Sequence, residues 1–169
     1  DAAFGVGRYL GDPIEGGVDL DSAYDVLSEI NTDGNVAITA MDDWFASGGG
    51  DGPEANLYAL QQAAQNGAGG SEEATGWRPG AQKVILWFGD IEGHQDTVTL
   101  NEAIAALNDE NVIVIGFNSS SGNFGIDRSF ADGTGDTRNQ ASAVTDATGG
   151  ALVNNFRSQS GDDLLATVT

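Results

Sequence analysis

The sequence predicts an α/β fold, an open and mostly parallel β-sheet with helices on both faces. Strand-like and helix-like patterns alternate along the chain, which is typical of parallel sheets joined by helices. Two continuous apolar runs, at 83–89 and 112–117, indicate strands buried on both faces. A length of 169 residues and a hydrophobic content of 40% suit one domain, residues 1–169, with one core.

The remaining elements follow from periodicity and from residues that start or stop helices. Further strand patterns lie at 3–10, 24–30 and 151–156. Helical patterns lie at 33–45, 53–65, 99–107, 137–148 and after 161. Pro53 suits the first position of a helix, and Thr99 with Glu102 forms a capping-box pattern. We expect Val36, Met41, Trp44 and Phe45 to form the apolar side of their helix.

The balance of acidic and basic side chains limits which kinds of partner the chain could bind. The net charge is -20, from 26 acidic and 6 basic side chains, which argues against nucleic acid as a partner. There is no apolar run long enough to span a membrane, and cysteine is absent, so thiolate metal sites are excluded. The acidic surface fits either simple solubility or carboxylates partly neutralised by divalent cations.

Acidic residues gather where the predicted strands end. Asp12 follows the strand at 3–10, Asp51 and Glu54 lie in a glycine-rich loop before a helix, and Asp90 directly follows the strand at 83–89. Three titratable residues come after it: Glu92, His94 and Asp96. The carboxyl ends of parallel strands form one edge, where ligands bind. Asp90 either caps the next helix or binds a hard cation through oxygen.

Three segments carry a resemblance to a known family. They are FGVGRYLGDP at 4–13, GGGDGPEANLYALQQAA at 48–64 and GWRPGAQKVILWFGDIEGH at 76–94. In order and spacing they resemble von Willebrand factor A-type domains, and within these the I-like domain of integrin β subunits and its bacterial relatives. The resemblance implies a Rossmann-like fold and a metal-ion-dependent adhesion site that holds Mg²⁺ or Ca²⁺.

The resemblance also implies specific metal ligands. Glu54 and Asp90 match two acidic positions of the adhesion site. Asp12, Asp51, the carbonyl of Pro53 and Glu54 match the neighbouring calcium site. Two departures weaken that second site: a family asparagine is Gly49 here, and Asp12 is offset by about one residue.

The family's Asp-x-Ser-x-Ser motif, which ends its first strand, is not found in this sequence. The first strand and helix of the family are therefore expected to be missing. In the family that strand lies between the strands equivalent to 3–10 and 83–89, so its absence leaves two unpaired edges. We expect an N-terminal segment outside this sequence, or a separate chain, to supply it.

The resemblance implies a binding module and not an enzyme. A cation with one open coordination position would be completed by an acidic side chain of a protein partner, in an extracellular or cell-surface setting. One alternative is a structural or assembly domain with a degenerate metal site. Another is a metal-assisted hydrolase that uses Asp90, Glu54 and His94.

Overall fold

The structure is a computed structural model that describes residues 1–11, 23–44, 52–65, 74–120, 125–130 and 134–156. Strands and helices alternate along this part of the chain, which confirms the α/β class. The elements are β1 (Phe4–Tyr9), β2 (Tyr24–Asn31), α2 (Gly34–Met41), α3 (Asn56–Gln65), β3 (Lys83–Gly89), α4 (Leu100–Asp109), β4 (Val112–Asn118), α5 (Gln140–Thr148) and β5 (Ala151–Val153).

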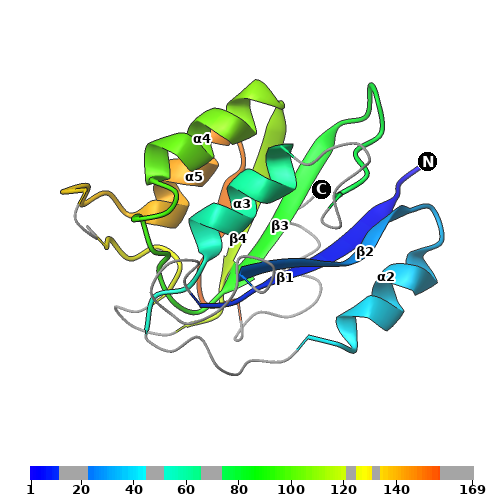
Figure 1. Cartoon of the computed structure of the whole chain (residues 1–169), viewed down its shortest axis with the longest axis horizontal. Helices are drawn as coiled ribbons and strands as arrows, with labels where there is room; N and C mark the ends of the chain where they lie inside the picture. The colour runs from blue at the N-terminus through cyan, green and yellow to red at the C-terminus, as the bar shows by residue number, and fades with distance from the viewer. Residues whose placement is uncertain (12–22, 45–51, 66–73, 121–124, 131–133, 157–169) are drawn as a thin grey trace.

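The described strands form two separate sheets. Strands β3, β4 and β5 make a parallel sheet in that order, and β1 pairs with β2 as an antiparallel ladder (Figure 1). No ladder joins β1 to β3 within the described residues. The fold is thus α/β with a parallel three-stranded sheet and an antiparallel pair, and these strands do not join into one continuous sheet.

The main core lies between the parallel sheet and α3, α4 and α5, which gather on one side of it (Figure 1). The largest fully buried apolar side chains of this cluster are Leu57, Leu100, Leu107, Val112, Val114, Ile126 and Val144. Burial of apolar surface on this scale is the dominant stabilising term for a domain of this size. Gly150 lies so close to the Val114 carbonyl that a Cβ there would overlap it, so only glycine fits between α5 and β5.

The antiparallel pair is covered on both faces. Helix α2 packs Ala37 and Ala40 against Val6, with Leu27 beside them. On the opposite face, α3 packs against Tyr24 in a second small cluster. Figure 1 shows α2 on the side of β1 and β2 away from α3. The β1–β2 ladder therefore has helices on two faces, whereas the described helices next to the parallel sheet lie on one.

The predicted apolar side of the helix beginning near Asp33 is wrong for the residues that the structure describes, and Phe45 lies outside them. Val36, Met41 and Trp44 are 39%, 41% and 42% exposed, and the buried positions are the small residues Ala37 and Ala40. Small side chains let the helix approach the glycine-containing strand β1 closely, and this packing turns the larger side chains outward.

The expected burial of β3 on both faces is also wrong. Trp87 is buried at 3% exposure, as predicted, but Val84 and Leu86 are 40% and 50% exposed. Side chains alternate between the two faces of a strand, and α3, α4 and α5 cover the face that carries Trp87. The other face of β3 is not covered by a described helix.

Helix boundaries were predicted with mixed success. Thr99 caps α4, and both hydrogen bonds of the capping box with Glu102 are present, which confirms the pattern. Helix α3 begins at Asn56 and not at Pro53, because Glu54 pairs with Gly93 in an isolated β-bridge. Strand β5 ends at Val153, and the helix expected after residue 161 lies outside the described residues.

Candidate metal-binding face

The carboxyl ends of β1 and β3 meet the segment that leads into α3. The Glu54 N–H donates to the Glu92 carbonyl at 3.0 Å, and the His94 N–H donates to the Glu54 carbonyl at 3.0 Å. These two bonds make the parallel bridge between Glu54 and Gly93. The bridge fixes Glu54 beside the loop that follows β3, although the two segments are far apart in the sequence.

Side chains tie the end of β1 to the same place. The Gly11 N–H donates to the Glu54 carboxylate. The Tyr9 hydroxyl donates to the Phe88 carbonyl at 2.7 Å and accepts from the Trp87 indole N–H at 3.2 Å. The ends of β1 and β3 are therefore connected through a tyrosine side chain.

The electrostatics of the Tyr9 hydroxyl involve two of the predicted ligands. Burial is the main cause that raises the pKa of the Tyr9 hydroxyl far above its usual value, and the hydrogen bond from Trp87 opposes this rise. The negative charges of Asp90 and Glu54 raise this pKa further. The negative charges of both predicted ligands therefore act on one hydroxyl.

Asp90 is exposed and makes no hydrogen bond or ion pair with the described residues. The alternative that it caps the next helix is wrong, because Thr99 holds that position. A surface carboxylate at the end of a strand with no partner is available to bind a ligand.

The rest of the predicted ligand set is only partly described. Asp12 and Asp51 lie outside the described residues, and Pro53 is half-buried next to Glu54. Within the described ranges, no group of three or more histidine or acidic side chains is close enough to hold a metal ion. Carboxylate oxygens suit Mg²⁺ or Ca²⁺, but two carboxylates fall short of the about six to eight oxygen ligands that Ca²⁺ takes.

Buried amide side chains that were not predicted from the sequence support this face. Gln140, fully buried at the start of α5, accepts from the Gly93 N–H at 2.6 Å and donates to the Gly93 carbonyl at 2.7 Å. Asn56, also fully buried, donates to the Ile91 carbonyl at 2.8 Å. These bonds satisfy the backbone of the loop after β3 and hold it in place.

Glu92 is a buried acid whose burial was not predicted from the sequence. It is 2% exposed, and one of its oxygens lies 3.0 Å from an Arg128 guanidinium nitrogen. Its other oxygen, Oε2, is buried and has no hydrogen-bond partner among the described residues, and the same holds for Asn56 Oδ1. Unpaired buried oxygens are uncommon because each loses its hydration.

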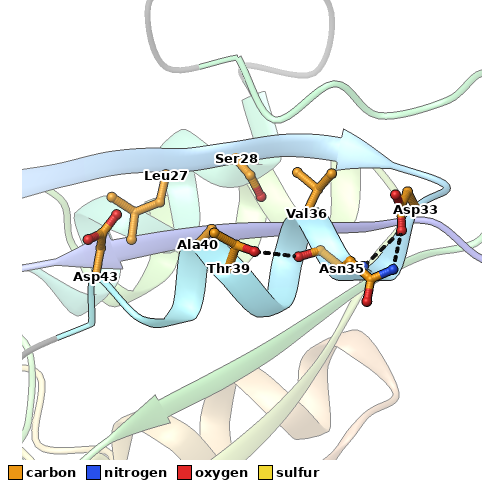
Figure 2. Close-up of a pocket in the computed structure, with 8 residues that line it drawn as sticks. All are labelled: Leu27, Ser28, Asp33, Asn35, Val36, Thr39, Ala40 and Asp43. Carbon is orange, nitrogen blue, oxygen red and sulfur yellow. Dashed lines mark hydrogen bonds between the residues drawn. The ribbon is translucent and has the colours of Figure 1, made fainter.

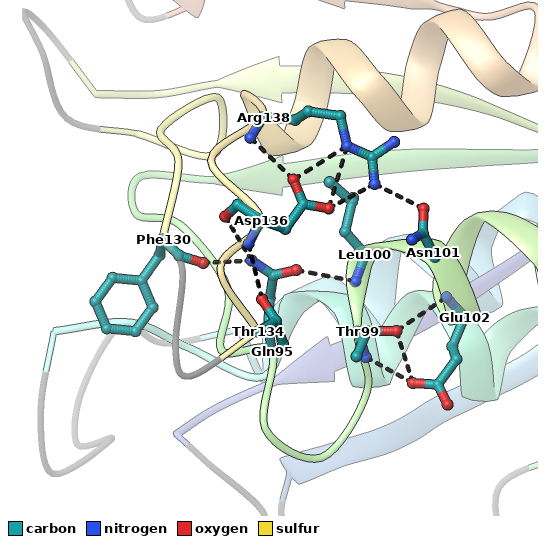
Figure 3. Close-up of polar contacts among 9 residues, drawn as sticks. All are labelled: Gln95, Thr99, Leu100, Asn101, Glu102, Phe130, Thr134, Asp136 and Arg138. Carbon is teal, nitrogen blue, oxygen red and sulfur yellow. Dashed lines mark hydrogen bonds and ion pairs between the residues drawn. The ribbon is translucent and has the colours of Figure 1, made fainter.

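A second polar network fixes the loop between β3 and α4 (Figure 3). The Gln95 side chain accepts from the Leu100 N–H at 3.1 Å and donates to the Phe130 carbonyl. Nearby, the Arg138 side chain bonds both oxygens of Asp136 and lowers the pKa of that carboxyl. The loop after β3 is thus joined to the chain before α5.

His94 lies in this face, as expected for the single histidine. It is 7% exposed, and its ring makes an edge contact with Phe130, with centroids 5.8 Å apart.

A separate groove of about 440 Å³ lies between α2 and β2 (Figure 2). Its lining includes Asp33 and Asp43 but none of the predicted ligands.

Comparison with known proteins adds no identification: no family model matches the chain, and no curated protein matches it. The resemblance to von Willebrand factor A-type domains therefore stays a prediction. None of the described helices is long and apolar enough to cross a membrane.

Proposed function

We propose that this chain is a divalent-cation-dependent binding module, similar to a von Willebrand factor A-type domain. Glu54 and Asp90 contribute carboxylate oxygens to a Mg²⁺ or Ca²⁺ ion, and an acidic side chain of a protein partner completes its coordination. The observation that carries this proposal is that the Gly11 N–H holds the Glu54 carboxylate at the end of β1, where the Tyr9 hydroxyl binds the carbonyl of Phe88, two residues before the exposed Asp90.

The chemistry of the donors supports a hard cation. Glu54 uses Oε2 to accept from the Gly11 N–H, which orients the carboxylate toward the end of β1. Asp12, Asp51 and the Pro53 carbonyl would supply the further oxygens that such an ion requires. A bound cation would also offset part of the net charge of -20. Extracellular or cell-surface sites, where Ca²⁺ is abundant, suit such a module.

Calorimetric titration with CaCl₂ and MgCl₂ tests the proposal. We expect the wild-type chain to bind one of these ions at about millimolar concentration or below, as extracellular modules do. The substitutions Asp90→Asn and Glu54→Gln each remove one negative charge, and we expect either to weaken binding at least about tenfold.

Asp109→Asn is the matched control, because it makes the same charge change at the exposed end of α4. It should leave the affinity unchanged. A wild-type chain that binds neither ion, or an Asp109→Asn variant as weak as Asp90→Asn, would contradict a local site.

A second candidate is an assembly domain that takes a β-strand from elsewhere. It is supported by the missing ladder between β1 and β3 and by the exposed side chains Val84 and Leu86 of β3. The strand would come from an N-terminal segment outside this sequence or from a separate chain. Partner binding that persists in a metal chelator would favour this function over the first.

A further inference from the structure

The edges of β1 and β3 that face each other are not used for pairing within the described residues. The Gly89 carbonyl accepts from the Ser119 N–H at 2.8 Å, so Gly89 points its backbone toward β4. Successive residues of a strand point their backbone groups to opposite sides, so Phe88 points toward the other edge. By the same argument Leu86 and Val84 present their backbone groups at that free edge.

The free edge of β1 is identified in the same way. The Leu10 N–H donates to the Ala23 carbonyl, so Leu10 points toward β2. Backbone groups alternate between the two edges of a strand, so those of Tyr9 and Gly7 point away from β2. We call the facing edges of β1 and β3, from Gly7 to Tyr9 and from Val84 to Phe88, the β1–β3 seam.

Two aromatic side chains cap carbonyl groups of this seam. The Tyr9 hydroxyl donates to the Phe88 carbonyl at 2.7 Å, and the Trp44 indole N–H donates to the Gly7 carbonyl at 3.1 Å. Side-chain donors thus occupy acceptors that a neighbouring strand would otherwise use. Tyr9 also packs against the buried cluster of Tyr24, Ala59 and Ala63, which makes it a fixed part of the fold.

Trp44 is held far more weakly than Tyr9. It follows the end of α2 and is 42% exposed, unlike the buried Trp87. Besides the bond to Gly7, its ring contacts the Phe88 ring, with centroids 5.9 Å apart. Trp44 therefore spans the seam from β1 to β3 with one neutral hydrogen bond and one ring contact.

We propose that Trp44 is a displaceable latch over the β1–β3 seam, and that the seam binds an extended apolar β-strand when Trp44 moves away. This inference rests on the proposed assembly function and does not depend on a cation. The Tyr9–Phe88 bond stays in place, and the bound strand would supply backbone N–H and C=O groups to Gly7 of β1 and to Val84 and Leu86 of β3, as in recognition by β-strand addition.

The chemistry of the seam defines the bound strand. Val84, Leu86 and Phe88 share one face of β3, and Val84 and Leu86 are exposed, so alternate residues of the strand should be apolar. The strand needs free backbone N–H groups, which excludes proline at the paired positions. The net charge of -20 favours basic residues at its ends.

A labelled peptide tests the latch. The probe copies Val112–Asn118, the strand that already pairs with β3 in parallel register, with lysines at both ends and a fluorescein label. Fluorescence anisotropy in chelator measures its affinity for the wild-type chain, Trp44→Ala and Trp44→Phe. We expect Trp44→Ala to bind about tenfold more tightly than wild type, because the peptide no longer displaces a hydrogen bond and a ring contact.

Trp44→Phe keeps a ring but lacks the indole N–H, so its affinity should lie between the two. Ile38→Ala is the matched control, since Ile38 is 60% exposed on α2, and it should bind like wild type. A peptide with proline at two alternate positions should bind to none of the variants. Circular dichroism of each variant confirms that it remains folded.

Three results would overturn the inference. Equal affinity of wild type, Trp44→Phe and Trp44→Ala would eliminate the latch but leave strand binding intact. Equal binding of the proline peptide would show that the backbone of the seam is not what the peptide pairs with. No binding by any variant would eliminate the seam as a binding site. Because the assay is run in chelator, these results are independent of whether the cation proposal fails.

Discussion

Replacing Gly89 with alanine should disrupt the contact between β1 and β3. A Cβ at this position would lie 2.6 Å from Ile126 Cγ2 and even closer to the Tyr9 hydroxyl. Overpacking of this kind typically costs about 1–3 kcal/mol. Displacement of Tyr9 would also weaken its two hydrogen bonds, each worth about 0.5–1.5 kcal/mol. We expect Gly89→Ala to lower the free energy of unfolding by about 3 kcal/mol.

A double-mutant cycle with Tyr9→Phe tests this reasoning. Tyr9→Phe alone should cost about 1–2 kcal/mol, because it leaves the Phe88 carbonyl and the Trp87 N–H without partners. In the double variant the clash with the hydroxyl is gone and the same hydrogen bonds are not lost twice. The combined cost should therefore be smaller than the sum of the single costs by at least about 1 kcal/mol.

Urea unfolding followed by far-UV circular dichroism measures these free energies. Gly52→Ala serves as the control, because a Cβ at Gly52 would meet nothing within 4 Å. It should change the stability by less than about 0.5 kcal/mol. Additivity of Gly89→Ala and Tyr9→Phe within about 0.5 kcal/mol would refute the proposed contact.

Two further predictions concern polar groups that hold the loops. Thr99→Ala removes the N-cap of α4 and should cost about 1 kcal/mol by urea unfolding. The hydrogen bonds with Thr99 lower the pKa of Glu102 below its usual value of 4.5, so their stabilising effect is present above that value and lost as pH falls through the lowered pKa. The variant should therefore lose less stability than wild type between neutral pH and acid, and an equal loss would contradict this cause. Arg128→Ala leaves the buried Glu92 carboxylate without its counter-charge and should cost about 2 kcal/mol, whereas Arg128→Ala combined with Glu92→Gln should be more stable than Arg128→Ala alone. A double variant no more stable than the single one would show that the cost does not come from the unpaired charge.

Local patterns in the sequence were sufficient to locate most elements but not to assign their faces. Thr99 and Glu102 are three residues apart, so the capping box could be read directly. The exposure of Leu86 could not be read from the apolar run of β3, because it depends on which face α3, α4 and α5 cover. Trp44 was expected on the apolar side of its helix, yet the buried positions of α2 are the small residues Ala37 and Ala40.

In the candidate site, too, local sequence patterns predicted some residues, whereas others depend on contacts between distant parts of the chain. The order of strands and loops predicted that Glu54 and Asp90 lie near each other, and the structure shows that Glu54 pairs with Gly93 in the loop after β3. Tyr9 and Gln140 were not predicted, because their partners are 79 and 47 residues away in the sequence. A tyrosine that ends a strand and a glutamine that starts a helix have no local pattern that distinguishes them from surface residues.

The proposed cation site and the β1–β3 seam share their central residues. Tyr9 donates to Phe88 within the seam, and its hydroxyl lies in the field of Asp90 and Glu54. Glu54 in turn accepts from Gly11, two residues beyond the end of β1. A shift of β1 relative to β3 would therefore change the position of the Glu54 carboxylate, and a cation bound there would oppose that shift. For this reason Gly89, whose missing Cβ makes room for Tyr9, is the position at which one substitution acts on both surfaces.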